Sequence, residues 1–441
     1  MTPGSRFVHI DVWRLAGPMI LSNLTIPVLG MVDTAVVGHL SEPYYLGAVA
    51  IGSLIFSFVY WAFGFLRMGT TGQVAQAHGR DDHTEIRSAF ARAFCLALVL
   101  ACVMLAFQAP IHWLAMLLLD ASPEVELYAG EYFFVRIWSA PASLINYVLI
   151  GWFLGMQNAR GPLYLLLLIN IINIALDLWF VWGLGLGVAG VAWASVIAEY
   201  LGVVLGLWLV ARELRLYPGQ WLKAQIFNAA KLRQMLLLNQ NIMIRTLCLI
   251  FSFAFFTAQG AKHGDLILAA NAVLMNFQTF MAYALDGFAH AAEALVGKAV
   301  GKRNQDEFKR AVHTAAIWSV GLAAGFVFAY GLFGRLLVEL LTDIEAVREV
   351  AYQFLPWLVI APILSVWSYL FDGVFIGATW SAEMRNTMLI ATFLCFLPAW
   401  YFLQGFGNHG LWAALMVFMI ARGVAMAISY RSLLRREAFF A

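Results

Sequence analysis

Most of this chain consists of apolar runs that are long enough to cross a lipid bilayer. A membrane helix needs about 20 predominantly apolar residues, and we find twelve runs of that kind in the 441 residues. Only 12% of the residues are Asp, Glu, Lys or Arg, whereas a soluble domain carries about a quarter. We therefore expect an all-α integral membrane protein. The expected spans are 12–38, 46–76, 87–110, 124–156, 162–184, 188–211, 233–260, 266–297, 309–332, 345–377, 385–403 and 408–430.

The longest interruption between apolar runs lies near the middle of the chain and divides the spans into six and six. It begins at Arg212 and ends at Arg233. We expect an N-terminal six-helix lobe at 1–216, a cytoplasmic linker at 217–232 and a C-terminal six-helix lobe at 233–441.

Lysine and arginine predict the orientation in the membrane. With a cytoplasmic N-terminus, most of these residues fall in cytoplasmic segments or at the helix ends beside them, as cytoplasmic loops prefer. The polar N-terminus is short, and the apolar run behind it is too long for a signal peptide. We expect a multi-pass protein of the inner (plasma) membrane with both termini in the cytoplasm.

The two halves of the sequence repeat each other. At an offset of 222 residues, Leu46 aligns with Leu268 and Phe58 with Phe280, and the loop AHGRDDHTEIR aligns with AVGKRNQDEFK. An even number of helices per repeat gives both halves the same orientation in the membrane. We expect two six-helix bundles related by pseudo-two-fold symmetry, with transport by alternating access.

Carboxylates within apolar runs are the strongest functional signal. Asp33 lies in the first span, and Asn170, Asn173 and Asp177 share one face of the fifth, since they are three and four residues apart. Ser195 on the sixth span could complete this cluster. A charge at such depth costs several kcal/mol or more, so a buried acid is usually protonated, paired or part of an ion path. If Asp33 and Asp177 approach each other, their repulsion favours binding of a proton. The alternative is a static hydrogen-bond network.

The first span also contains two prolines, Pro18 and Pro27. Proline removes a backbone hydrogen bond and kinks a helix. A helix that carries both a titratable acid and a proline could bend when the acid gains or loses a proton. The alternative is a static kink, which is common in membrane helices.

The second half carries a different polar set. Asp286 lies on the eighth span, Asp372 on the tenth and Arg245 on the seventh. We expect the acids to line a cavity or to take part in coupling, and Arg245 to pair with one of them. We expect no bound metal, because no second group of metal-ligand residues accompanies these acids.

Motifs of enzyme chemistry do not occur in the sequence. It has no glycine-rich phosphate loop, GxSxG, HExxH or CxxC. We expect no catalytic residues, no cofactor and no nucleic-acid partner, since the formal charge is only +2. Uphill transport would then use an ion gradient or another subunit.

Four features together resemble the multidrug and toxic compound extrusion (MATE) transporters, and within them the DinF-like branch. These are the duplicated halves, GMVDTAVVGHL on the first span, the spacing from Asn173 to Asp177, and SYLFDGVFIGATWSAEMRN on the tenth span. The resemblance implies two six-helix bundles and export of lipophilic, often cationic, organic compounds against H⁺ or Na⁺. It also implies that Asp33 is the protonation site, with Asn173 and Asp177 as partners, and that Pro18 is the bending proline.

One departure bears on the coupling ion. The sodium-coupled NorM-like branch pairs a glutamate on the seventh span with the aspartate on the tenth, and 241–260 contains no glutamate here. We therefore expect proton coupling in a monomer, and sodium coupling is the alternative. A lipid or lipid-linked sugar flippase ranks lower because only Arg67 and Arg245 fall within spans. A membrane-embedded aspartyl protease is a third alternative.

Overall fold

The structure is a computed structural model that describes residues 3–37, 43–119 and 122–435. Within its helices, the side chains of 3–7, 27–31, 33, 34, 37, 43, 118 and 119 also lie outside the described part. Asp33 and Pro27 are among these residues, so their backbone belongs to a described helix and their side chains do not.

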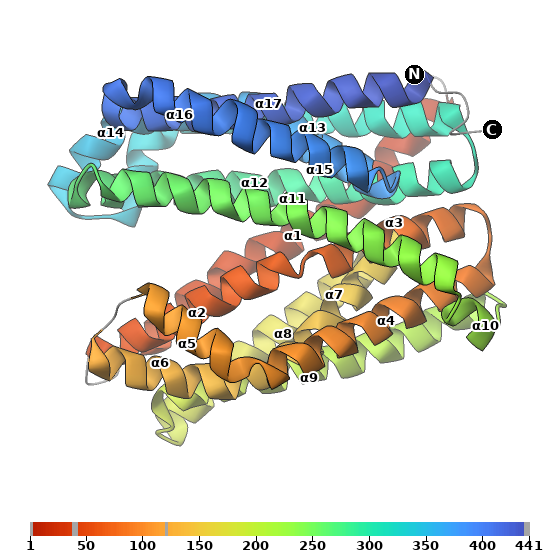
Figure 1. Cartoon of the computed structure of the whole chain (residues 1–441), viewed down its shortest axis with the longest axis horizontal. Coiled ribbons are helices and arrows are strands. Elements are labelled where there is room, and N and C mark those ends of the chain that lie inside the picture. The colour runs from red at the N-terminus through yellow and green to blue at the C-terminus, as the bar shows by residue number, and fades with distance from the viewer. Residues whose placement is uncertain (1–2, 38–42, 120–121, 436–441) are drawn as a thin grey trace. The chain divides into compact units, whose positions relative to one another are not determined.

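The chain forms two compact units, and no strand occurs in the ranges just given. The first unit comprises Leu21–Met235, and its helices run alongside one another (Figure 1). Its helices are the second part of α1 (Pro3–Val37), α2 (Pro43–Ala62), α3 (Phe65–Gly79), α4 (His83–Ala106), α5 (Gln108–Leu119), α6 (Pro123–Arg136), α7 (Ala140–Gly155), α8 (Arg160–Asp177), α9 (Gly187–Glu213) and α10 (Lys223–Ile226). A π-helical segment, Leu178–Gly183, extends α8.

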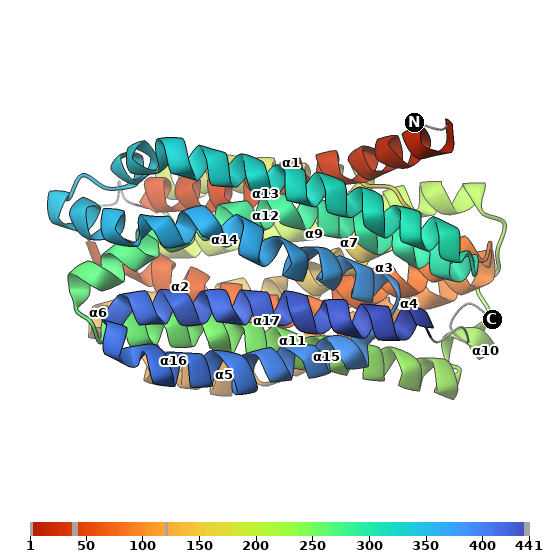
Figure 2. The ribbon, with the colours of Figure 1, turned by 90° about the horizontal axis from the view of Figure 1, so that it is seen from above.

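The second unit comprises Leu236–Ala441 together with Met1–Ile20, and Figure 2 shows its long helices from a second direction. Its helices are the first part of α1, most of α11 (Ala229–Ala261), then α12 (Asp265–Gly301), α13 (Gln305–Leu341), α14 (Glu345–Gly377), α15 (Ser381–Leu389), α16 (Leu397–Leu403) and α17 (Gly407–Arg435). A π-helical segment, Ile390–Phe396, joins α15 to α16.

Ten helical segments of the described residues are long and apolar enough to cross a membrane. One of them, Ser381–Arg435, contains two of the expected spans, 385–403 and 408–430. The helix α1, with 35 residues, contains residues 12–37 of the first expected span, 12–38. The twelve-helix integral membrane fold expected from the sequence is therefore confirmed.

The sequence repeat is also a structural repeat. Two residues other than glycine adopt positive φ in the first unit, Asp81 (54°) and Gln157 (59°), and their counterparts at an offset of 222 do the same, Arg303 (56°) and Thr379 (57°). These residues end helices in the αL conformation, which few side chains tolerate. The duplicated turns therefore stop the corresponding helices at the same places in both units.

Two glycines lie at close helix contacts in equivalent places of the two units. A Cβ on Gly151 would lie 2.3 Å from the carbonyl oxygen of Arg67 on α3. A Cβ on Gly373 would lie 2.2 Å from the carbonyl oxygen of Ala289 on α12, again at an offset of 222. Such distances leave no room for a side chain, so small residues allow the backbones to approach, as in other membrane bundles.

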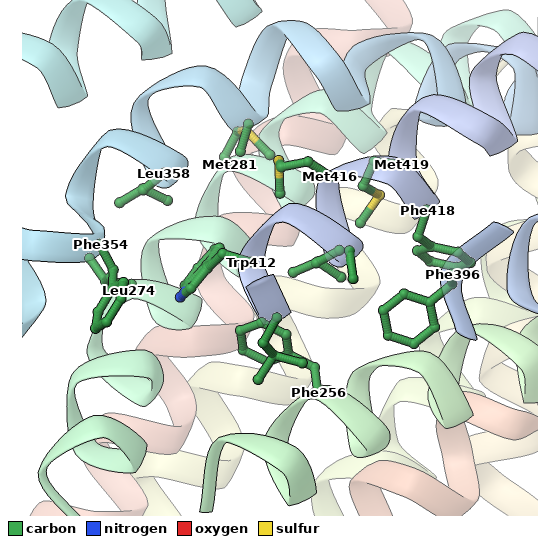
Figure 3. Packing of buried hydrophobic residues seen from close by; sticks show 14 of the residues in the cluster. Phe256, Leu274, Met281, Phe354, Leu358, Phe396, Trp412, Met416, Phe418 and Met419 are labelled. Atoms are coloured by element: carbon green, nitrogen blue, oxygen red, sulfur yellow. The ribbon is translucent and has the colours of Figure 1, made fainter. Parts of the chain in front are cut away.

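The interior of the second unit is built from large apolar side chains of α11, α12, α14 and α17 (Figure 3). Trp412 is completely buried there, and its indole N–H donates to Asn271 Oδ1 at 2.9 Å. Asn271 and Asn408 exchange two further hydrogen bonds of 2.8 and 2.9 Å. Lipid tails are as apolar as these side chains, so close packing and satisfied polar groups hold the unit together.

The helix α1 belongs to both units. In its first part, Trp13 packs edge-on against Phe288 and Trp318, with ring centroids 5.2 and 5.1 Å apart. From Leu21 onward it belongs to the first unit. These aromatic contacts tie the first part of α1 to α12 and α13, and the domain bounds expected from the sequence stay a prediction.

The linker between the halves is held to the first unit by buried charges. Arg92, only 3% exposed, donates to the carbonyl oxygen of Gln225 on α10 at 3.0 Å and forms an ion pair with Glu85. Glu85 also forms an ion pair with Lys231. The carboxylate of Glu85 on α4 thus contacts the beginning of α11, which follows the linker.

Candidate functional site

The polar face expected on the fifth span is buried in the first unit. Asn173 is 2% exposed and Asp177 is completely buried, both on α8, and Ser195 on α9 is 8% exposed. One orientation of the Asn173 amide gives partners to both of its ends. In it, Nδ2 donates to Asp177 Oδ2 at 2.9 Å, and the amide oxygen accepts from Ser195 N at 3.2 Å and from Ser195 Oγ at 2.9 Å. The structure therefore joins these three residues in one cluster.

Asn170 connects the same face of α8 to α1. Its Nδ2 donates to Thr25 Oγ1 at 2.7 Å, and Thr25 in turn donates to the carbonyl oxygen of Ser22. Ser22 is completely buried. The polar face of α8 thus contacts α9 through Asn173 and α1 through Asn170, and three helices meet along it.

Two predictions concern α1 itself. The side chains of Asp33 and Pro27 lie outside the described residues, so the approach of Asp33 to Asp177 stays a prediction. Pro18 lies two residues before the boundary between the units, next to Gly17, whose added Cβ would meet nothing within 4 Å. The bending role of either proline also stays a prediction.

The acid of the tenth span has two arginine partners. Asp372 on α14 is 7% exposed, and its Oδ2 accepts from Arg245 on α11 and, at 2.7 Å, from Arg422 on α17. The expected pairing of Arg245 with an acid is therefore present. Arg422 is 1% exposed.

Several polar atoms of this second cluster lack a hydrogen-bond partner in the part of the chain that the structure describes. Asp372 Oδ1 and the Nε atoms of Arg245 and Arg422 are buried without a hydrogen-bond partner among the described residues. Tyr369 and Asp286 are close enough to Arg422 to interact with it electrostatically. With Asp286 included, two carboxylates face two guanidinium groups, so the cluster is close to neutral overall.

A further carboxylate within a span, Glu199 on α9, was missed in the sequence, and its side chain is 19% exposed. It lies one turn beyond Ser195 and accepts from Asn146 Nδ2 on α7 at 2.7 Å. Arg136 on α6 forms an ion pair with it at 3.9 Å. The signal was available, because Glu199 interrupts the apolar run of the sixth span just as Asp177 interrupts the fifth.

Metal ligands do not gather in the part of the chain that the structure describes. No group of three or more His, Cys, Asp or Glu side chains in residues 3–37, 43–119 and 122–435 could hold a metal ion. The buried carboxylates instead lie beside amide, hydroxyl and guanidinium groups. These arrangements can exchange a proton or hold a fixed ion pair.

Comparison with known sequences assigns the chain to a family. The MatE family model matches residues 18–179 and 242–402, one match in each half. The chain is 43% identical over 432 residues to DNA damage-inducible protein F of Escherichia coli K12, covering 98% of this chain and 94% of that protein. It is 26% identical to Protein DETOXIFICATION 44, chloroplastic, of Arabidopsis thaliana, covering 96% and 82%.

Solved structures agree on the fold. A MATE transporter of Vibrio cholerae, VcmN, in its bent form superposes with a TM-score of 0.86 at 21% identity, covering 99% of both chains. A MOP superfamily transporter from Pyrococcus furiosus gives 0.87 at 18% identity, covering 100% of this chain and 99% of that one. The chain is a multi-pass membrane protein, and it belongs to the MATE family of transporters, in the branch of DNA damage-inducible protein F.

Proposed function

We propose that the protein is a secondary active exporter that moves small lipophilic or cationic organic compounds out of the cell in exchange for protons, by alternating access. The observation that carries the proposal is the complete burial of Asp177 beside the neutral groups of Asn173 and Ser195. The coupling site would be Asp33, Asn173 and Asp177.

The contrast between the two units supports a proton site in the first. Asp372 is held by two guanidinium groups, so its charge is already compensated by fixed partners. The amide of Asn173 can keep one hydrogen bond to Asp177 in either protonation state, because an amide both donates and accepts. Asp177 can therefore gain and lose a proton without leaving its cluster.

Helix geometry supports a shared depth for Asp33 and Asp177. Both lie on odd-numbered spans, so α1 and α8 cross the membrane in the same direction, and Thr25 is bonded to Asn170. Asp33 lies eight residues beyond Thr25, and Asp177 seven beyond Asn170. At 1.5 Å per residue these steps are about 12 and about 10.5 Å. The two acids would thus lie about level in the membrane.

The proposed cycle follows from this placement. Two carboxylates at one depth, with little water to screen them, repel each other until one binds a proton. Protonation then changes the hydrogen bonds that α1 makes, and this helix carries Pro18 and Pro27. The bend of α1 would change when the proton binds or leaves. The change in bend would in turn change the affinity for the exported compound.

The test uses full-length protein in proteoliposomes with separately imposed proton and sodium gradients. We expect a fluorescent organic cation to be transported under a proton gradient alone, and Asp33→Asn and Asp177→Asn to abolish this transport. Asp343→Asn is the matched control, because that side chain is fully exposed. Folding of each variant is checked by size-exclusion chromatography.

Two results would contradict the proposal. Transport that follows the sodium gradient alone would replace the proton by sodium as the coupling ion. Transport at the normal rate by a folded Asp33→Asn protein would remove the coupling role from the first unit.

A further inference from the structure

A half-open cavity of about 400 Å³ lies between the N-terminal parts of α1 and α13 in the second unit. Both helices begin at the same end of this unit (Figure 2). The lining residues are Val8, His9, Lys309, Arg310, His313, Thr314 and Ile317. Four of these seven side chains are basic or can become so, and none is acidic.

The position of the cavity along α13 corresponds to the surface of the membrane. Between His313 and Arg335 the helix has no charged residue, a stretch of about 30 Å at 1.5 Å per residue. This length matches the hydrocarbon core of a bilayer. Lys309, Arg310 and His313 therefore lie directly outside the hydrocarbon, at the level of the lipid headgroups.

Tryptophans mark the same level on both helices. Trp318 donates through its indole N–H to His9 Nδ1 at 3.0 Å, and Trp13 packs against Trp318. Tryptophan is enriched at the membrane interface, where its ring lies among the headgroups. Because His9 Nδ1 accepts this bond, its Nε2 carries the proton and is available as a donor.

The two cations of the cavity, Lys309 and Arg310, are exposed and form no close ion pair in the described part of the chain. Glu307 pairs with Lys302 instead. Asp306 is exposed and does not line the cavity. The site thus offers positive charge and N–H donors to an anion.

We propose that this cavity binds the phosphate headgroup of an anionic phospholipid. Lys309 and Arg310 contact the phosphate, His9 donates a hydrogen bond, and one acyl chain follows α13 along Ile317, which is 46% exposed. Basic pockets between membrane helices on the cytoplasmic side bind such headgroups. The orientation expected from lysine and arginine places this end of α13 in the cytoplasmic leaflet, where anionic lipids attract cations.

Exposure along α13 favours a lipid over a free anion as the occupant. Only 17% of the most apolar window of this helix is buried, and Phe328 and Leu332 are 69% and 61% exposed. A lipid can satisfy the cations with its headgroup and cover this apolar surface with its tail. Inorganic phosphate could do only the first.

The experiment measures lipid retention by native mass spectrometry of the full-length protein in detergent. Phosphatidylglycerol is titrated against phosphatidylcholine on the wild type, on Lys309→Ala/Arg310→Ala and on Lys302→Ala/Arg303→Ala. The last variant loses the same charge at the same end of the unit, outside the cavity. We expect a phosphatidylglycerol affinity at least about tenfold lower for the first variant and little change for the second, since each cation near a headgroup contributes separately.

A charge-conserving variant, Lys309→Arg/Arg310→Lys, separates loss of the site from loss of the fold, and it should retain phosphatidylglycerol. An equal loss of phosphatidylglycerol affinity in the two alanine variants would overturn the proposal. So would a wild type that does not prefer phosphatidylglycerol to phosphatidylcholine. Complete displacement of the lipid by millimolar inorganic phosphate would also overturn it, because a free anion would then be sufficient.

Discussion

Removing the charge of Asp372 should destabilise the second unit severely. In Asp372→Asn, two buried guanidinium groups lose the carboxylate that both of them contact, and Asp286 is left as their counter-charge. Their side chains are 5% (Arg245) and 2% (Arg422) exposed, so water cannot screen them. Breaking a buried ion pair from one side costs about 3–5 kcal/mol.

This cost corresponds to a measurable change in thermal stability. In domains of 150–250 residues, 1 kcal/mol shifts Tm by about 2–4 °C, so we expect Tm to fall by about 10 °C. The measurement is thermal unfolding of the purified protein, followed by tryptophan fluorescence. Asp343→Asn is the control, because its ion pair with Arg348 is at the surface and such pairs contribute about 0–1 kcal/mol.

A second variant tests the reason for the loss. Replacing the three ion-paired residues (Arg245→Met/Asp372→Leu/Arg422→Met) removes both guanidinium groups together with the carboxylate that they share, and apolar replacements of buried ion pairs are often neutral. This variant should recover most of the lost Tm. The reasoning is refuted if Asp372→Asn unfolds within about 2 °C of the wild type, or if the triple variant loses as much as the single one.

Two further predictions follow from the packing of the first unit and from the linker. Gly151→Ala should destabilise by about 1–3 kcal/mol, since its Cβ would overlap a backbone oxygen of α3; Gly321→Ala, which meets nothing within 4 Å, should be neutral or stabilising by up to about 1 kcal/mol. Equal thermal stability of these two variants would refute the close contact. Arg92→Ala should release α10 and accelerate tryptic cleavage at Lys223, because the bond to Gln225 and the ion pair with Glu85 are lost; Arg431→Ala, at the end of α17, is the control. Cleavage at the wild-type rate in Arg92→Ala would show that these contacts do not hold the linker.

The two duplicated halves use their buried carboxylates differently. In the first unit, Asp177 lies beside the neutral groups of Asn173 and Ser195. In the second unit, two arginines hold Asp372. The shared turns and glycine contacts preserve the helix arrangement within each half, while the polar side chains have diverged. The proton exchange that we propose concerns the first unit, and the ion pairs of Asp372 belong to the second.

The amino-acid sequence alone determined the spans, the duplication and the polar face of α8. These are local properties: a run of about 20 apolar residues sets a span, and spacings of three and four set a helix face. The loops that align at the offset of 222 contain Asp81 and Arg303, and both residues adopt positive φ.

Only the tertiary structure decided which distant residues meet. Arg422 lies 50 residues from Asp372 in the chain. The apolar sequence around Arg422 does not indicate whether this arginine is a buried ion-pair partner or a cation at the end of a helix. The partners of Glu199 are Asn146 and Arg136, and both lie on other helices. The first part of α1 joined the second unit through contacts of Trp13 with residues about 300 positions away. Such partnerships depend on how helices pack against one another, and a hydropathy pattern records only the environment of each helix.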